Sequence, residues 1–170
     1  MRAKLSRVAA AWVLIAAVGV LRPAAAADSA VSVHDIRLGL FGACFVSANE
    51  GWVVGDLGRV YRTADGGKTW ARQEVAGRRP FFSVSCTDAQ HAWLSSAQGS
   101  LFATSDGGKT WQEQKAPVKR NLFKVAFSTP QRGTAVGDFG LIVHTEDGGA
   151  TWSVVELPDS FKLPDSALDQ

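Results

Sequence analysis

The octapeptide Thr63-Ala-Asp-Gly-Gly-Lys-Thr-Trp70 returns twice in this chain, and its repetition decides the fold. The other copies are Thr104-Ser-Asp-Gly-Gly-Lys-Thr-Trp111 and Thr145-Glu-Asp-Gly-Gly-Ala-Thr-Trp152, each 41 residues after the one before. A constant period near 40 residues is typical of a repeat architecture. The alignment predicts three units, 40–80, 81–121 and 122–162, between a lead-in at 28–39 and a tail at 163–170.

Each unit predicts four short strands separated by turns. In the third unit these strands are residues 122–128, 133–136, 141–145 and 151–157. We expect the first of them to place Phe123, Val125 and Phe127 on one face, because side chains alternate along a strand. Four strands in every 40 to 45 residues are typical of β-propeller blades. The predicted fold class is therefore all-β: three four-stranded propeller blades, incomplete as a propeller unless the chain oligomerises.

The octapeptide itself is explained by folding, without any catalytic role. An Asp at a hairpin corner accepts hydrogen bonds from nearby backbone N–H groups, and the glycines supply positive φ. The Trp that ends the motif buries a large ring against the sheet. The Thr hydroxyls can satisfy further backbone groups. The predicted structural residues of the three boxes are Asp65, Gly67, Thr69, Trp70, Asp106, Gly108, Thr110, Trp111, Asp147, Gly149, Thr151 and Trp152.

The pattern [Ser/Thr]-x-Asp-x-Gly-x-Thr-Trp resembles the Asp-box, or BNR, repeat of sialidases, other glycosidases and non-enzymatic propellers. The longer stretches 51–70 and 133–140, with Gly-Asp-x-Gly ahead of the box, resemble the photosystem II stability/assembly factor family. That resemblance covers residues 40 to about 157. It implies an exported, non-catalytic scaffold that binds a protein client, such as a membrane-complex subunit. The alternative is a carbohydrate-binding or sialidase-related propeller.

Three blades are fewer than the four to eight of a closed propeller. Three arrangements stay open: two chains joined head to tail in a six-blade ring, an incomplete propeller, or an open three-blade monomer. In the first two, the apolar faces of the end blades need a partner. A strand at 31–36 would close a ring by pairing with a terminal blade.

The N-terminus carries the pattern of a secretory signal peptide at 1–27. A basic start is followed by the apolar run 8–21 and by the cleavage-site residues 25–27, all alanine. The chain has a formal charge of +2, but this segment holds four basic residues and no acidic one. Without it, 14 basic residues face 16 acidic ones, a formal charge of about −2. We therefore expect Sec-type export to a periplasm or thylakoid lumen, and no nucleic-acid partner.

Candidates for catalysis or metal binding are weak in this sequence. The single tyrosine, Tyr61, aligns with strand positions, whereas a sialidase would need a tyrosine nucleophile with carboxylate partners. Asp56 and Asp138 occupy matching turns, which their turn chemistry explains. The three histidines, His34, His91 and His144, share no ligand-like spacing. We predict no enzyme activity, no metal and no cofactor.

The two cysteines lie at nearly equivalent points of successive units. Cys44 aligns with Ser85, one position before Cys86, so the two side chains have opposite phase on their strands. Opposite phase is what residues facing each other between stacked blades require, and export permits oxidation. A Cys44–Cys86 disulfide between blades one and two is one expectation, and two buried thiols are the other.

Basic side chains recur at the junctions between units. Arg78 and Arg79 end the first unit, and Lys119 and Arg120 occupy the matching place in the second. Two equivalent pairs would lie on one rim of the propeller, and the resemblance to the assembly factors implies that an arginine-rich face engages the client. The candidate partner-binding residues are Arg59, Arg62, Arg78, Arg79, Lys119 and Arg120, with a solvated surface as the alternative.

Overall fold

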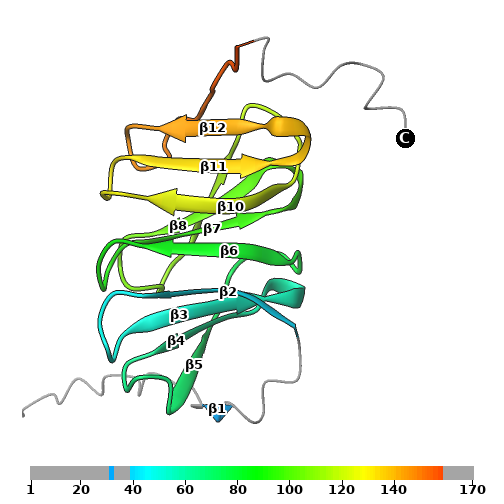
Figure 1. Ribbon diagram of the computed structural model, residues 1–170. Helices are drawn as coiled ribbons and strands as arrows, with labels where there is room; N and C mark the ends of the chain where they lie inside the picture. Colours follow the sequence, from blue (N-terminus) through cyan, green and yellow to red (C-terminus); the bar gives the residue numbers. More distant parts are fainter. Residues whose placement is uncertain (1–30, 33–38, 159–170) are drawn as a thin grey trace, which may run out of the picture.

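The computed structural model describes residues 31–32 and 39–158, which form three stacked antiparallel sheets (Figure 1). Their strand orders are β1-β5-β4-β3-β2, β6-β7-β8-β9 and β10-β11-β12-β13. The all-β prediction of three four-stranded blades is confirmed. The strands are β1 (Val31–Ser32), β2 (Leu40–Phe45), β3 (Gly51–Gly55), β4 (Val60–Thr63), β5 (Thr69–Gln73), β6 (Phe81–Cys86), β7 (Ala92–Ser96), β8 (Ser100–Thr104), β9 (Gln112–Lys115), β10 (Leu122–Phe127), β11 (Gly133–Gly137), β12 (Ile142–Thr145) and β13 (Ser153–Val154).

The lead-in contributes β1 to the first blade. Val31 pairs with Trp70 and Ser32 with Thr69, so β1 is an outermost fifth strand of this sheet. The remainder of the strand expected at 31–36, the signal peptide at 1–27 and the tail at 163–170 lie outside the described residues. Within the described ranges, no helix is long and apolar enough to cross a membrane.

The blades pack through their faces. The first strands β2, β6 and β10 of successive blades contact one another, and in Figure 1 β6 lies between β2 and β10. Two apolar clusters fill the two seams between blades. The seam between blades one and two buries Trp52, Val54, Val60, Phe81, Val84, Leu94 and Phe102. The seam between blades two and three buries Trp93, Leu101, Leu122, Val125, Phe127, Ala135 and Val143.

The predicted shared face of Phe123, Val125 and Phe127 is wrong at its first position. Val125 is 1% exposed and Phe127 9%, but Phe123 is 48% exposed. The pairing of β10 with β11 is irregular between Leu122 and Lys124, where a bulge interrupts the alternation of side chains. Leu122, which is fully buried, therefore enters the seam, and Phe123 points away from it.

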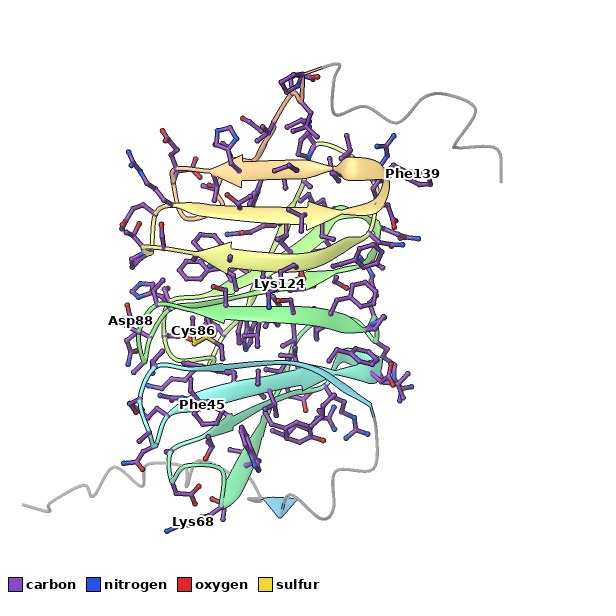
Figure 2. All side chains as sticks on the ribbon, viewed as in Figure 1. Phe45, Lys68, Cys86, Asp88, Lys124 and Phe139 are labelled. Carbon is purple, nitrogen blue, oxygen red and sulfur yellow. A yellow bond between two sulfur atoms is a disulfide. The ribbon has the colours of Figure 1, made fainter. Side chains whose placement is uncertain are left out.

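A 3-10 turn follows the second strand of each blade: η2 (Asp56–Gly58), η3 (Ala97–Gly99) and η4 (Asp138–Gly140). The segments that connect successive blades hydrogen-bond to these turns, as in the bond from Gly99 N to Arg120 O. The 3-10 turns and the blade connections thus share one end of the stack, which we name the turn end. The Asp-box corners lie at the opposite end. Figure 2 shows Phe139 at the turn end and Asp88 at the other.

Candidate functional site

The Asp-box is a corner held by its own side chains. Thr63 Oγ1 donates to Asp65 Oδ1 (2.9 Å) and accepts from Gly67 N (2.9 Å). Asp65 in turn accepts from the Thr69 backbone N–H (2.9 Å) and from the Thr69 hydroxyl (2.6 Å). The Trp70 ring is 6% exposed, and its Nε1 donates to Gly67 O. The same Thr and Asp bonds recur in the boxes around Asp106 and Asp147.

These bonds keep the box carboxylates ionised. The hydrogen bonds from Thr69 lower the pKa of Asp65 from 3.8 to about 2, and bonds from Thr110 and Thr151 do the same for Asp106 and Asp147. A carboxyl group with such a low pKa cannot serve as a general acid near neutral pH. The three boxes act as structural corners.

A glutamine links each of the first two blades to the Asp-box of the next blade. Gln73 Nε2 donates to Gly107 O (2.9 Å), while its Oε1 accepts from Trp52 Nε1 (3.1 Å). Gln114, 41 residues later, donates to Gly148 O (3.1 Å). Sequence reasoning missed these side chains, although their 41-residue spacing was a usable signal.

On the face of the third blade that no other described blade covers, the Trp and Gln that make these contacts in the first blade are replaced. Thr134 occupies the position of Trp52, and Val155 occupies that of Gln73. Thr134 is exposed, and Val136 beside it is 40% exposed. This face therefore cannot receive another Asp-box through the contacts that the other two seams use.

A covalent bond also joins blades one and two across the first seam. Cys44 on β2 and Cys86 on β6 form a disulfide, with their Cα atoms 6.0 Å apart, visible between the first two blades in Figure 2. The equivalent place in the second seam holds a hydrogen bond, in which Phe127 N donates to Ser85 Oγ (2.9 Å). At both seams, two residues 42 apart in sequence and of opposite strand phase therefore face each other.

The basic candidates divide into two groups. Arg78, Lys119 and Arg120 lie at the turn end, are exposed, and form no ion pair with another described residue. The Arg120 guanidinium carbon lies 5.4 Å from the centroid of the Phe139 ring. Three cationic groups are therefore available at this end.

The other three basic candidates are engaged within the fold. Arg59 donates to the hydroxyl of Tyr61, which is itself 3% exposed. Arg62 lies toward the Asp-box end, where it donates to Glu50 (3.0 Å) and covers the Trp52 ring. Arg79 bonds to Ser100 Oγ and lies 3.6 Å from Glu113. These contacts give all three residues a structural role.

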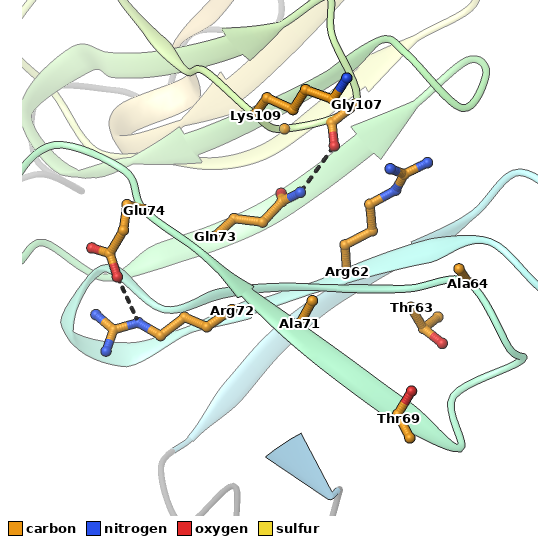
Figure 3. A pocket seen from close by; sticks show the side chains of 11 residues that line it. Arg62, Thr63, Ala64, Thr69, Ala71, Arg72, Gln73, Glu74, Gly107 and Lys109 are labelled. Carbon is orange, nitrogen blue, oxygen red and sulfur yellow. Dashed lines mark hydrogen bonds and ion pairs between the residues drawn. The ribbon is translucent and has the colours of Figure 1, made fainter. Parts of the chain in front are cut away.

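A groove of about 450 Å³ runs between β5 of blade one and the Asp-box of blade two (Figure 3). Its lining includes Arg72, Glu74 and Lys109, and Glu74 forms an ion pair with Arg72. A groove of about 620 Å³ lies at the corresponding place in the second seam. Because the groove recurs with the repeat, it is a consequence of blade packing.

Two of the polar groups outside the boxes, His91 and Asp138, have local partners. His91 Nδ1 lies 2.9 Å from Asp88 Oδ2, and Asp138 Oδ2 accepts from Asn121 N (3.1 Å). Asp56 lies in η2, the turn that matches η4 of Asp138. His144 is exposed on β12, and His34 lies outside the described residues. In the part of the chain that is described, no three His, Cys, Asp or Glu side chains gather as a metal site.

Stacked four-stranded blades with an Asp-box at each corner define a β-propeller protein of the Asp-box class, present here as a partial propeller. The sequence profile of the photosynthesis system II assembly factor YCF48 family matches residues 79–168, and the chain belongs to this family.

Solved structures agree with this assignment. The chain is 29% identical to YCF48 from Cyanidioschyzon merolae, with a TM-score of 0.60 over 69% of this chain and 39% of that one. A YCF48 structure described as bound to a D1 peptide is 22% identical, with a TM-score of 0.63 over 69% of this chain and 40% of that one. The chain thus spans about 40% of the length of these structures.

The fold also resembles that of an ancestral GH74 enzyme, at 17% identity and a TM-score of 0.60 over 71% of this chain and 19% of that one. At this identity the likeness concerns the fold alone. No curated protein matches the chain.

Proposed function

We propose that this protein is an exported, non-catalytic scaffold that binds a protein client, a subunit of a membrane complex, through its turn end. The observation that carries the proposal is the group Arg78, Lys119 and Arg120, exposed together on a YCF48-type propeller. A YCF48 structure described as bound to a D1 peptide shows that a propeller of this family can hold a polypeptide.

The charge at the turn end favours an acidic segment of the client. Exposed cations attract and orient an acidic partner as it approaches, and they contribute mainly to association rate and specificity. Arginine also binds carboxylates through two parallel N–H···O bonds. Arg78 and Lys119 occupy equivalent positions of successive blades, so the cations form a row rather than a point.

Two observations support export. The N-terminal pattern at 1–27 is that of a secretory signal peptide. The Cys44–Cys86 disulfide belongs to an oxidising compartment, because cytosolic thiols are normally kept reduced. A periplasm or a thylakoid lumen provides that environment.

The grooves do not favour glycoside hydrolysis. That reaction uses two carboxyl groups about 5–10 Å apart, one of which is protonated as the acid. In the second groove, Glu113 lies against Arg79, and the pKa of Asp147 is lowered to about 2. Tyr61 is buried against Arg59 and cannot act as a sialidase-type nucleophile.

The test is capture of the client from solubilised host membranes, with the bound polypeptides identified by mass spectrometry. The double variant Arg78→Glu/Lys119→Glu should lose the membrane-complex subunit that the unmodified protein captures. Arg132→Glu is the control, because Arg132 is also exposed but lies in the loop that follows β10, away from the turn end, where it lies 3.9 Å from Glu146. Equal capture by all three proteins would contradict the proposal.

A further inference from the structure

Three phenylalanines form a row across the first strands of the three blades. Phe41 on β2 is 51% exposed, Phe123 on β10 is 48% exposed, and Phe82 on β6 between them is half-buried. The ring centroids of Phe41 and Phe82 are 6.5 Å apart, and those of Phe82 and Phe123 are 5.7 Å apart. We name these three residues the Phe ladder.

The exposure of the Phe ladder is built into the repeat. Each ladder residue sits where the pairing of its strand is irregular, between Leu40 and Gly42 in the first blade and at the matching points of the others. A bulge re-aims a side chain that regular alternation would have turned into the seam. Folding alone does not call for an exposed aromatic ring at the same bulge in all three blades.

The Phe ladder lies beside the cationic group of the turn end. Phe123 follows Arg120 by three residues, and Arg120 covers the ring of Phe139, which is 71% exposed. Phe82 follows Arg78 by four residues. An apolar row and a basic row therefore run in the same direction from blade to blade.

We propose that the Phe ladder binds an extended peptide of net negative charge that carries apolar side chains at alternate positions. In an extended chain, residues i and i+2 point the same way and lie about 6.6 Å apart. This spacing matches the 6.5 Å and 5.7 Å between the ladder rings, so successive apolar side chains would each meet one ring. The cations beside the ladder select the sign of the peptide charge.

The size of the patch favours a peptide over a second copy of the chain. Phe41 and Phe123, each about half exposed, and the less exposed Phe82 together offer roughly 250 Å² of apolar surface. A stable protein–protein interface buries about 800 Å² on each partner. Patches of a few hundred Å² on a monomer are often functional sites. This inference rests on the proposed function and specifies the chemistry of its client.

The experiment measures peptide binding to the oxidised protein by fluorescence anisotropy. The probe is a labelled peptide of alternating Glu and Leu with three Leu residues. It is compared with a peptide of the same composition whose Leu residues are consecutive, and with an alternating Lys and Leu peptide. We expect the alternating acidic peptide to bind at least about tenfold more tightly than either of the others, since hot-spot contacts are worth a factor of this size.

The variants test the ladder directly. Phe82→Ser/Phe123→Ser should weaken binding of the alternating acidic peptide about 30-fold, and Phe123→Ser alone should weaken it less. Phe45→Ser is the matched control, because Phe45 is also 48% exposed on β2 but lies at the opposite end of that strand, and it should leave binding unchanged. Near-ultraviolet circular dichroism verifies that each variant is folded.

Equal binding of the alternating and consecutive peptides, or unchanged binding by the ladder variants, would overturn the inference. A dimer in light scattering that becomes a monomer in Phe82→Ser/Phe123→Ser would also overturn it, because the occupant would then be a second copy. If the ladder variants still capture the membrane client but Arg78→Glu/Lys119→Glu does not, the ladder is refuted while the proposed function stands.

Discussion

Removing the Cys44–Cys86 disulfide should cost this protein a large part of its stability. The bond joins residues 42 apart in sequence, from the first strand of blade one to the first strand of blade two. In the chain-entropy model, a link over a loop of this length stabilises the fold by about 4 kcal/mol, chiefly by restricting the unfolded chain. Total stabilities of domains are about 5–15 kcal/mol, so the effect is easily measured.

The assay is equilibrium urea unfolding, followed by tryptophan fluorescence, of the oxidised protein and of Cys44→Ala/Cys86→Ala. With an m-value of about 2 kcal/mol per molar urea, the double substitution should lower the unfolding midpoint by about 2 M. Reduction of the unmodified protein should lower it by a similar amount. Both cysteines are only partly buried, so the lost packing adds little to the difference.

The control is Ser85→Ala, which removes the hydrogen bond at the equivalent point of the second seam. This change leaves the buried Phe127 N–H without a partner and should cost about 1–3 kcal/mol. If the double cysteine variant and Ser85→Ala shift the midpoint equally, or if reduction shifts it by less than the experimental error, the reasoning is refuted. The seam would then be stabilised by packing, and the covalent link would be incidental.

Three more results are expected. The hydrogen bonds from Thr110 lower the pKa of Asp106 from 3.8 to about 2 in the folded protein, so the contribution of Asp106 to stability is complete above about pH 5 and is lost as the pH falls toward 2. In thermal melts between pH 2 and 6, Asp106→Asn should therefore lose less stability at low pH than the unmodified protein. An unchanged dependence of the melting temperature on pH would contradict this expectation. Gly108→Ala should destabilise the protein by about 2 kcal/mol more than Gly140→Ala in urea unfolding. Both positions have positive φ, but only at Gly108 would an added Cβ clash with the Gln73 side chain, whose displacement breaks its bonds to Gly107 O and Trp52 Nε1. Equal costs would show that the glutamine moves aside freely. The third blade has Thr134 and Val155 at the positions of Trp52 and Gln73, so light scattering should find single chains. A two-chain ring would show that blades also join by other contacts.

The sequence predicted the blades well because the repeat carries its own turn chemistry. The boxes at Asp65, Asp106 and Asp147 are each explained within a few residues, since their bonds are local. Phe123 was placed on the wrong face because a bulge changes side-chain direction without leaving a clear signature in the residue pattern. Long-range contacts such as Gln73 to Gly107 depend on how one blade meets the next.

The candidate site was predicted only in part, for the same reason. Arg78, Lys119 and Arg120 are identifiable as basic residues at equivalent blade junctions. Their availability, in contrast to the engaged Arg62 and Arg79, is a property of the packed structure. A side chain is free or used according to neighbours that lie far away in sequence.

The amino-acid sequence by itself determined the all-β class, the 41-residue blade and its Asp-box corners, because strand alternation and turn geometry act over a few residues. Tertiary structure alone decided which residues are buried in the seams, which cations remain at the turn end, and that three bulged phenylalanines share one surface. These features arise where separate blades meet. The physical reason is that packing couples residues about 41 positions apart, a distance over which local propensity carries no information.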